Sequence, residues 1–341
     1  MLKNNIKLKF NKSIGNKSPC FIIAEIGINH NGDYSLLKKM IKTFAKCGAD
    51  AIKIQTINPY KSYVEGTKSF KEFQNKDFSE NQLLNLKRYA DKNSVILFST
   101  PGDLDSLYKI KRCNFDIIKV SSGLLTNHLL LKEILKTKKP VIISTGLAFK
   151  KEIDEVFKMC SLSKTKFALL KCTALYPSKD YQLNLNSIQS MISEYNVPIG
   201  YSDHTKDELS SLVAVAKGAK IIEKHVTFNK KLKGADHKIS IEPNDFKVMV
   251  SKIRRIESAL GSNLISPVDE EINVRRERHR CLICIRDIKP GDVFSLKNIS
   301  LKRPLKNKYG LSSKFLNNIL YKTSKSFIKV DSPILMRDIK K

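Results

Sequence analysis

The chain has 341 residues, which is enough to bury a large core and to carry one large domain with a small one. Its 62 Lys and Arg residues against 33 Asp and Glu residues give a formal net charge of +29, a balance that by itself suggests a nucleic-acid partner. The basic residues are scattered, however, without a basic–aromatic repeat or a recognised nucleic-acid motif. We therefore expect a solvated basic surface and no nucleic-acid partner.

The cysteine pattern and the hydropathy pattern exclude two further classes of protein. Seven cysteines in a chain of this length form no disulfide framework, and the Cys281-x-x-Cys284 pair alternates with apolar residues as a buried strand does. No apolar stretch has the length of a signal peptide's core or of a membrane span. We expect a cytoplasmic protein without a membrane partner.

Short apolar runs typical of buried strands recur along the chain. In chain order they cover residues 21–26, 51–55, 95–99, 116–120, 140–144, 167–172, 197–201 and 220–225. Amphipathic stretches such as 34–47, 81–92, 129–138 and 208–218 lie between them and predict helices. Eight strands alternating with helices over about 260 residues predict an α/β fold, a (β/α)8 TIM barrel. A doubly wound open sheet also alternates, but no Gly-x-Gly-x-x-Gly follows the first strand.

The chain after the barrel changes character. We expect the barrel to span residues 1–262, with residues 1–20 as an extension that caps it, and residues 263–279 to form a charged linker. Turn residues between Asp287 and Asp292 separate two strand-like runs, so residues 280–341 are predicted to form a small β-rich domain.

Two histidines, His204 and His225, each follow an apolar run, and an amphipathic helix closed by Gly218 separates them. A strand–helix–strand unit is parallel, so both strands end at the same mouth of the barrel. Two converging imidazoles suit a divalent transition metal. The alternative is that both are unrelated polar residues at loop starts.

Most of the other predicted strands also end in polar residues. These are Glu25, Lys53, Gln55, Ser99, Thr100, Lys119, Ser121, Ser122, Ser144, Thr145, Thr173, Tyr176, Ser202 and Glu223. Strand ends carry the chemistry of TIM-barrel enzymes, and two lysines among several hydroxyls indicate a phosphate site. Taken singly, each Ser or Thr is better explained as a turn residue or a helix cap.

Several motifs together resemble the sialic acid synthase family from about residue 20 to the C-terminus. They are Phe21-Ile-Ile-Ala-Glu-Ile-Gly-Ile-Asn-His-Asn-Gly-Asp33, Phe98-Ser-Thr-Pro101, Ile143-Ser-Thr-Gly146, Gly200-Tyr-Ser-Asp-His-Thr205, Ile222-Glu-Lys-His225, Gly234-Ala-Asp-His237 and Ser240-Ile-Glu-Pro243. The resemblance implies condensation of phosphoenolpyruvate with an N-acyl hexosamine to a nine-carbon 2-keto (nonulosonic) acid. It also implies that residues 280–341 form the family's closing module, the antifreeze-like (SAF) domain, which docks onto the partner subunit of a domain-swapped homodimer.

The resemblance also implies roles for particular residues. His204 and His225 match the ligands of a divalent metal, Mn²⁺ or else Mg²⁺ or Co²⁺. The positions that match phosphoenolpyruvate contacts are Lys53, Thr100, Lys119, Ser122, Ser144 and Ser202. Those that match sugar contacts are Gln55, Tyr176, Asp236 and, from the small domain, Arg303. Glu25 and Asp236 are the carboxyl groups expected to move protons, and Tyr176 is placed with them as a catalytic candidate.

Three positions depart from the family pattern. Leu124 stands where an acidic residue is usual, Ala174 replaces a polar residue, and Lys171 stands where His is common. The acceptor is left open between N-acetylmannosamine and a diacetamido-6-deoxyhexose. The alternatives are another phosphoenolpyruvate-dependent aldol-type synthase and a catalytically silent binding homologue.

Overall fold

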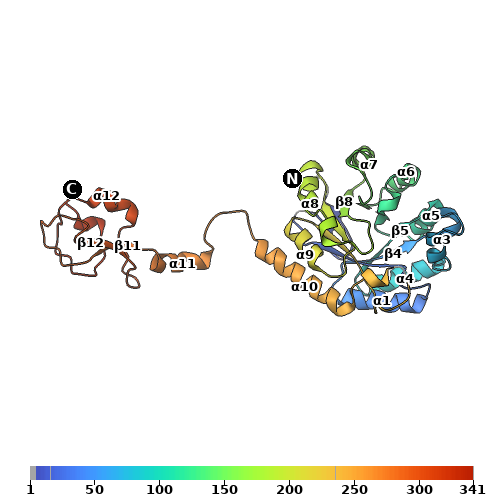
Figure 1. Ribbon diagram of the computed structural model, residues 1–341, viewed down its shortest axis with the longest axis horizontal. Coiled ribbons are helices and arrows are strands. Elements are labelled where there is room, and N and C mark those ends of the chain that lie inside the picture. Colours follow the sequence, from blue (N-terminus) through green and yellow to red (C-terminus); the bar gives the residue numbers. More distant parts are fainter. Residues whose placement is uncertain (1–4, 16, 235, 341) are drawn as a thin grey trace. The chain divides into compact units, whose positions relative to one another are not determined.

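The computed structural model describes residues 5–15, 17–234 and 236–340, and it divides the chain into two compact units, Met1–Gly261 and Ser262–Lys341. Figure 1 labels some of their helices and strands. Each unit has its own apolar core.

The larger unit is a closed barrel of parallel strands, as the sequence predicted. In the described residues its strands are β3 (Phe21–Gly27), β4 (Ala51–Thr56), β5 (Ile96–Pro101), β6 (Ile118–Val120), β7 (Val141–Ser144), β8 (Phe167–Cys172), β9 (Ile199–Asp203) and β10 (Ile221–His225). They pair in chain order, and β10 closes the ring between β9 and β3. All eight strand C-termini therefore meet at one mouth.

Helices surround this barrel, as Figure 1 shows. They are α1 (Tyr34–Lys46), α2 (Pro59–Ser62), α3 (Lys68–Phe73), α4 (Glu80–Lys92), α5 (Leu104–Arg112), α6 (His128–Lys136), α7 (Lys150–Leu162), α8 (Ser187–Glu194), α9 (Leu209–Ala216) and α10 (Pro243–Leu260). Their starts follow local capping chemistry: Asp33 accepts a hydrogen bond from Leu36 N, and Ser79 with Gln82 forms a capping box at α4.

The strands bury apolar residues on both faces. Outward residues such as Ile22 and Ile52 pack with helix residues such as Leu37 and Leu86. Inward residues fill the barrel below its mouth; they are Phe21, Ile23, Ala51, Ile96, Phe98, Ile117, Ile142, Ala168, Leu170 and Ile221. Because side chains alternate along a strand, the next inward positions toward each C-terminus are free to line the mouth.

A short hairpin of β1 (Ile6–Lys7) and β2 (Ser13–Ile14) precedes the barrel. Ile6 and Ile14 are fully buried and belong to the same cluster as the inward-facing strand residues. The hairpin therefore packs on the interior residues nearest the strand N-termini, at the end of the barrel away from the mouth.

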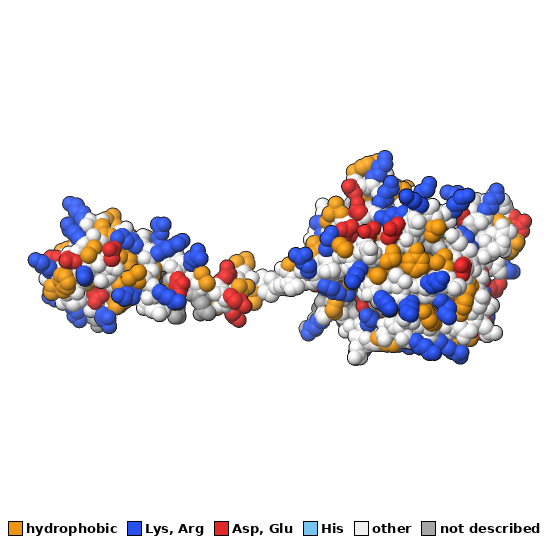
Figure 2. All heavy atoms as spheres, turned by 90° about the horizontal axis from the view of Figure 1, so that it is seen from below, with side chains coloured by type: hydrophobic (Ala, Val, Ile, Leu, Met, Phe, Trp, Pro, Cys, Tyr) orange, Lys and Arg blue, Asp and Glu red, His pale blue; other side chains and the backbone are white. Residues whose placement is uncertain are grey.

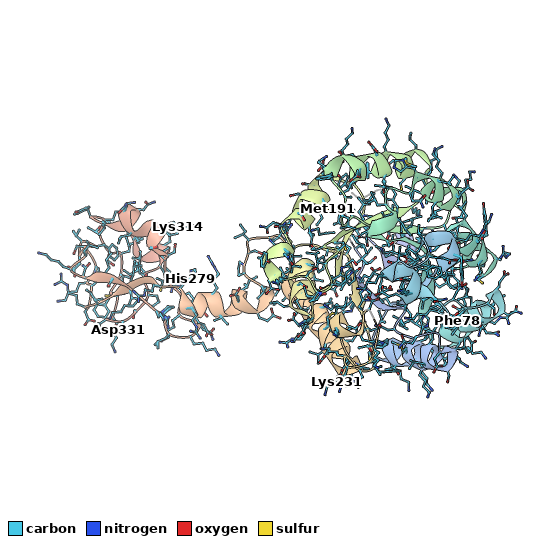
Figure 3. All side chains as sticks on the ribbon, turned by 45° about the vertical axis from the view of Figure 1, so that its right-hand side comes forward. Phe78, Met191, Lys231, His279, Lys314 and Asp331 are labelled. Carbon is cyan, nitrogen blue, oxygen red and sulfur yellow. The ribbon has the colours of Figure 1, made fainter. Side chains whose placement is uncertain are left out.

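The smaller unit contains α11 (Asp269–Arg278), the antiparallel pair β11 (Cys281–Cys284) and β12 (Ile299–Lys302), and the short helix α12 (Leu316–Ile319). Its core includes Leu282, Ile288 and Phe294. Most of the segment predicted as a linker is thus helical, ending next to the exposed His279 that Figure 3 labels. Cys281 and Cys284 lie in a buried strand, as their alternation predicted.

Two surface properties bear on function. On the faces visible in Figure 2, Lys and Arg side chains are dispersed among apolar and acidic ones. Within the described residues, no helix is both long enough and apolar enough to cross a membrane.

Candidate active site

A cavity of about 440 Å³ opens at the C-terminal ends of the barrel strands. It brings together eleven of the residues selected from the sequence: Glu25, Lys53, Gln55, Lys119, Ser122, Ser144, Tyr176, Ser202, His204, His225 and Asp236. Strand register explains part of this grouping, because His225, Glu25 and Lys53 are partners across the adjacent strands β10, β3 and β4.

The charged centre of the cavity joins two lysines to two carboxylates. Lys53 Nζ lies 3.0 Å from Glu25 Oε1 and 3.5 Å from Glu223 Oε2. Lys119 Nζ lies 3.9 Å from Glu223 Oε1 and donates to Ser144 Oγ at 2.5 Å. Glu223 Oε1 also accepts from Ser202 Oγ at 2.9 Å, so Glu223 links both lysines and a hydroxyl.

Burial and neighbouring charges shift the pKa values of these groups in different directions. Burial raises the pKa of Glu25 to about 7, although Lys53 opposes it. Burial also lowers the pKa of Lys119 to about 8, with Glu223 opposing. For Glu223, burial would raise the pKa, but Lys119 and Lys53 together lower it to about 2. Near neutral pH, Glu25 is therefore the carboxyl that can either hold or release a proton.

The two histidines selected from the sequence converge, with ring centroids 5.4 Å apart. His204 Nδ1 donates to Thr173 O at 2.8 Å, which leaves Nε2 as the lone-pair nitrogen. Among the residues that the structure describes, the buried Nδ1 of His225 has no hydrogen-bond partner, and Asp236 Oδ2 lies 3.7 Å from it.

This pair fits a divalent ion. Both rings line the same cavity and their centroids are 5.4 Å apart, so the two imidazoles are close enough to hold one ion. Within the described part of the chain, no cluster of three or more His, Cys, Asp or Glu side chains is arranged to hold a metal. An ion held by two imidazoles would keep positions open for water or substrate oxygens, as catalytic metal sites do.

The three side chains of the barrel unit that were matched to the sugar lie on this cavity. Tyr176 stacks near His204, with ring centroids 4.1 Å apart, and lies 6.0 Å from the His225 ring. Gln55 Nε2 donates to Glu25 Oε1 at 3.2 Å. Burial raises the pKa of Asp236, so this carboxyl also retains a proton more readily than usual.

Thr100 and Leu124 lie on an adjoining cavity of about 180 Å³, which shares Gln55, Phe73, Ser121 and Gly123 with the main one. Thr100 Oγ1 accepts from Lys53 Nζ at 3.4 Å, so Thr100 reaches the main cavity through that lysine. Leu124 does not line the main cavity, whereas Ala174 does.

Arg303 lies in the smaller unit, directly after β12, and is exposed. The groups above all belong to the barrel unit. Ser122 lies on the wall of the barrel cavity, and its Oγ accepts a hydrogen bond from Gly146 N at 3.1 Å.

Sequence reasoning gave no role to three features of the cavity. Glu223 was noted only as a strand end, although it stands two residues before His225 and therefore faces the same way. Cys172 lies 3.8 Å from His204 Nδ1, and this contact lowers the pKa of the thiol despite its burial. Residues of α3 line the cavity as well, and nothing in the sequence pattern marked that segment.

The two histidines in polar loops near the mouth have structural partners. His30 is buried against Phe78, labelled in Figure 3, with ring centroids 4.9 Å apart, and its Nδ1 accepts from Gly32 N. His237 is buried and pairs through Nδ1 with Thr227 Oγ1 at 2.7 Å. Neither lines the main cavity.

Comparison with known proteins places the chain in a family. Residues 40–264 match the model of the NeuB family. The chain belongs to the NeuB family. Among its relatives, an uncharacterised protein of Methanocaldococcus jannaschii is 39% identical over 96% of both chains. The N,N'-diacetyllegionaminic acid synthase of Campylobacter jejuni is 38% identical over 83% of this chain and 90% of its own.

Solved structures of related proteins share the architecture of this chain. The N-acetylneuraminic acid synthetase of Leptospira borgpetersenii serovar Hardjo-bovis, crystallised with citrate, superposes with a TM-score of 0.77 at 36% identity. The match covers 80% of this chain and 97% of that one. The barrel and the family predicted from the sequence are therefore confirmed.

Proposed function

We propose that this protein condenses phosphoenolpyruvate with an N-acyl hexosamine to form a nonulosonic acid and inorganic phosphate. The observation that carries the proposal is the meeting of two buried lysines, a convergent histidine pair and Glu25 in one cavity of about 440 Å³. The names of a legionaminic acid synthase and a sialic acid synthetase among its relatives support the same class of product.

In this proposal the lysines hold phosphoenolpyruvate. Lys53 and Lys119 supply buried positive charge, and Ser144 and Ser202 supply short-range hydroxyl donors beside them. Thr100 holds Lys53, and Ser122 adds a hydroxyl on the cavity wall. A cationic cradle that is already fixed costs no reorganisation as the negative charge on the phosphate changes during reaction.

His204 and His225 would hold a divalent ion such as Mn²⁺, Mg²⁺ or Co²⁺, which when bound supplies Lewis-acid polarisation of the sugar's carbonyl oxygen. The sugar itself would contact Gln55, Tyr176 and Asp236, which line the same cavity as both histidines. Carbon 3 of phosphoenolpyruvate then bonds to the sugar's carbonyl carbon, and carbon 2 becomes electron-poor.

Water adds to carbon 2, and the resulting tetrahedral phosphate adduct breaks its C–O bond to release phosphate and leave the 2-keto acid. As it adds, the attacking water loses one proton, and the former carbonyl oxygen of the sugar gains one. As the adduct collapses, the new hydroxyl gives its remaining proton to the departing phosphate. Glu25, with a pKa raised to about 7 by burial, can accept and return a proton at neutral pH. Asp236 is the second carboxyl placed for this task, beside His225.

The smaller unit completes the proposal. Arg303 would contact the N-acyl group of the sugar in the partner subunit of a homodimer, since its guanidinium can donate two hydrogen bonds to one acceptor group. Leu124 has no group that carries a proton, so in this proposal the proton-transfer task falls on Glu25 and Asp236.

Phosphate release tests the function directly. The purified protein is given phosphoenolpyruvate and Mn²⁺ with each of several N-acyl hexosamines, including N-acetylmannosamine and 2,4-diacetamido-6-deoxyhexoses, and products are identified by mass. We expect release of phosphate matched by a nine-carbon 2-keto acid with one sugar class. Release with shorter aldoses instead would indicate another aldol-type synthase, and no release with any sugar would indicate a silent homologue.

A further inference from the structure

Two charged residues immediately precede the histidines of the site. Asp203 comes before His204 on β9 and Lys224 comes before His225 on β10, and the two are register partners across these strands. Both are fully buried. Because their neighbours Ser202 and Glu223 line the cavity, Asp203 and Lys224 point to the opposite face of the barrel wall, toward α9.

Lys224 has all three of its ammonium protons within reach of acceptors on β9 and the turn after it. Its Nζ lies 3.0 Å from Asp203 Oδ2, 2.7 Å from Thr205 O and 3.2 Å from Thr205 Oγ1. A side chain on β10 thus holds the residues on both sides of His204.

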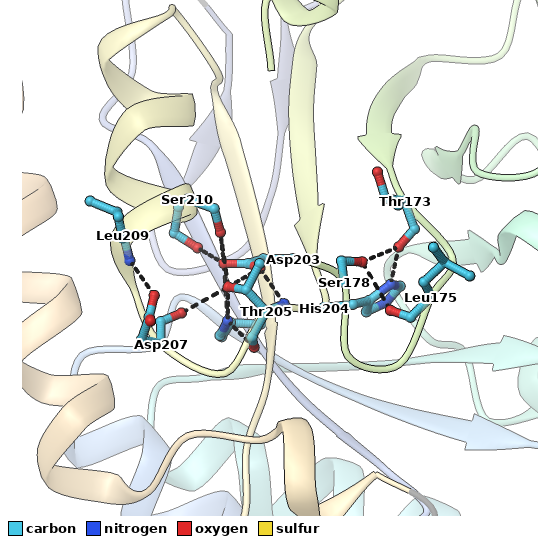
Figure 4. Close-up of polar contacts among 11 residues, drawn as sticks. Thr173, Leu175, Ser178, Asp203, His204, Thr205, Asp207, Leu209 and Ser210 are labelled. Carbon is cyan, nitrogen blue, oxygen red and sulfur yellow. Dashed lines mark hydrogen bonds and ion pairs between the residues drawn. The ribbon is translucent and has the colours of Figure 1, made fainter. Parts of the chain in front are cut away.

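Both carboxylate oxygens of Asp203 accept hydrogen bonds. Its Oδ1 accepts from Thr205 N and from Thr205 Oγ1, each at 2.8 Å. Its Oδ2 accepts from Ser210 Oγ at 2.8 Å and Ser211 Oγ at 2.6 Å, which ties the strand end to α9. Figure 4 shows Asp203 with Thr205 and Ser210 around it.

Contacts with β10, with α9 and with the loop after β8 therefore hold the chain around His204. Figure 4 also shows the neighbouring loop, where Thr173 O accepts from His204 Nδ1 and Ser178 N donates to His204 O at 3.1 Å. The imidazole keeps one tautomer and one direction, and the Lys224 contacts connect its backbone to the strand that carries His225.

Stability alone is a poor explanation for such a pair. A buried ion pair loses so much hydration that apolar residues of similar volume often stabilise a fold as well or better. A role in setting the geometry of groups beside it explains why two charges are buried here at adjacent strand ends. Groups that orient metal ligands from behind typically change metal affinity about 10- to 100-fold when they are removed.

We propose that Asp203 and Lys224 are positioning residues that lock the ends of β9 and β10 in register, so that His204 and His225 can share one divalent ion. This inference rests on the proposed function, since it requires an ion at the two imidazoles. It adds residues that touch neither the cavity nor the ion.

The test is Mn²⁺ binding to the full-length protein without substrates, measured by electron paramagnetic resonance of free Mn²⁺. The variant is the double substitution Asp203→Asn with Lys224→Met, which removes both charges together and leaves neither unpaired. We expect its Mn²⁺ Kd to rise at least about tenfold while circular dichroism shows the same secondary structure.

Arg254→Met is the matched control. Arg254 pairs with Asp50 at 3.2 Å and with Glu257 at 2.9 Å, near the strand N-termini at the other end of the barrel. Its loss should lower the melting temperature and leave the Mn²⁺ Kd within twofold of the wild-type value. If the Asp203–Lys224 pair had only a structural role, the double variant would resemble Arg254→Met: its melting temperature would fall and its Mn²⁺ Kd would stay within twofold of the wild-type value.

The outcomes separate this inference from the function on which it rests. If His204→Ala binds Mn²⁺ as tightly as the wild-type protein, the metal assignment and this inference both fail. If binding depends on His204 but the folded double variant keeps the wild-type Kd, only the positioning role is overturned. Should the double variant not fold, Thr205→Val decides: a Kd raised about threefold or more supports the role, and an unchanged Kd overturns it.

Discussion

Lys53 Nζ lies 3.0 Å from Glu25 Oε1, and these residues are register partners on β4 and β3. The pair is almost completely buried. Burial and Glu223 raise the pKa of Glu25, and Lys53 lowers it, with a net value of about 7. For Lys53, burial would lower the pKa, but Glu223 and Glu25 outweigh it and raise the pKa. The lysine is therefore charged at neutral pH, and the carboxyl is near its midpoint.

Glu25→Gln should remove the proton-carrying group and lower kcat about 100-fold or more. In the wild-type protein the carboxylate is the form that accepts a proton, and its fraction grows as pH rises through about 7. The rate should therefore rise between about pH 6 and pH 8 and level off above that range. Steady-state phosphate release against pH measures both effects. If the rate of Glu25→Gln still rose with pH over the same range, the group that titrates would not be Glu25.

His204→Ala and His225→Ala should each abolish the Mn²⁺-dependent part of turnover, because each removes one of only two protein ligands proposed for the ion. His128→Ala, on the exposed start of α6, is the control and should behave as wild type. The measurement is activity after chelation and readdition of Mn²⁺. Full activity of a chelated double His variant would contradict the metal assignment.

Lys119→Met should weaken the binding of phosphoenolpyruvate more than the binding of the sugar. The expected loss is about 2–4 kcal/mol of transition-state binding. Lys53→Met should do the same. Lys171→Met is the matched control, since Lys171 is a partly buried lysine on β8, another strand of the same barrel, and does not line the cavity. Separate KM values for the two substrates distinguish the effects. A rise in the sugar's KM alone would mean that the phosphate lies elsewhere.

Arg303→Ala mixed with His225→Ala should recover activity that neither variant has alone. In a symmetric dimer whose sites take Arg303 from the partner subunit, each mixed dimer holds one intact site. Equal mixing then predicts up to about a quarter of the wild-type activity. Subunit exchange is verified by mass before the assay. A mixture that exchanges subunits and stays inactive would place Arg303 in its own subunit's site or outside any site.

The barrel could be predicted from the sequence because apolar strand runs and amphipathic helices are local patterns. The predicted run 167–172 coincides with β8, whereas β9 begins two residues later than the predicted 197–201 run. Val197 N instead bonds Tyr195 O, and Leu169 N bonds Pro198 O, so pairing with the neighbouring strand decides where a strand begins. The end of the barrel that carries these residues could also be predicted, because the ends of parallel strands share one mouth.

The tertiary structure alone decided how those residues act on one another. Glu223 follows Lys119 by more than 100 positions and Lys53 by 170, yet its carboxylate lies within 4 Å of both ammonium groups. Asp203 and Lys224, behind the histidines, also meet only in the folded chain, where Lys224 Nζ lies 3.0 Å from Asp203 Oδ2. Local periodicity assigns a side chain to a face of a strand, but closing the barrel sets which charges meet and how deeply they are buried, and those two quantities fix their pKa values.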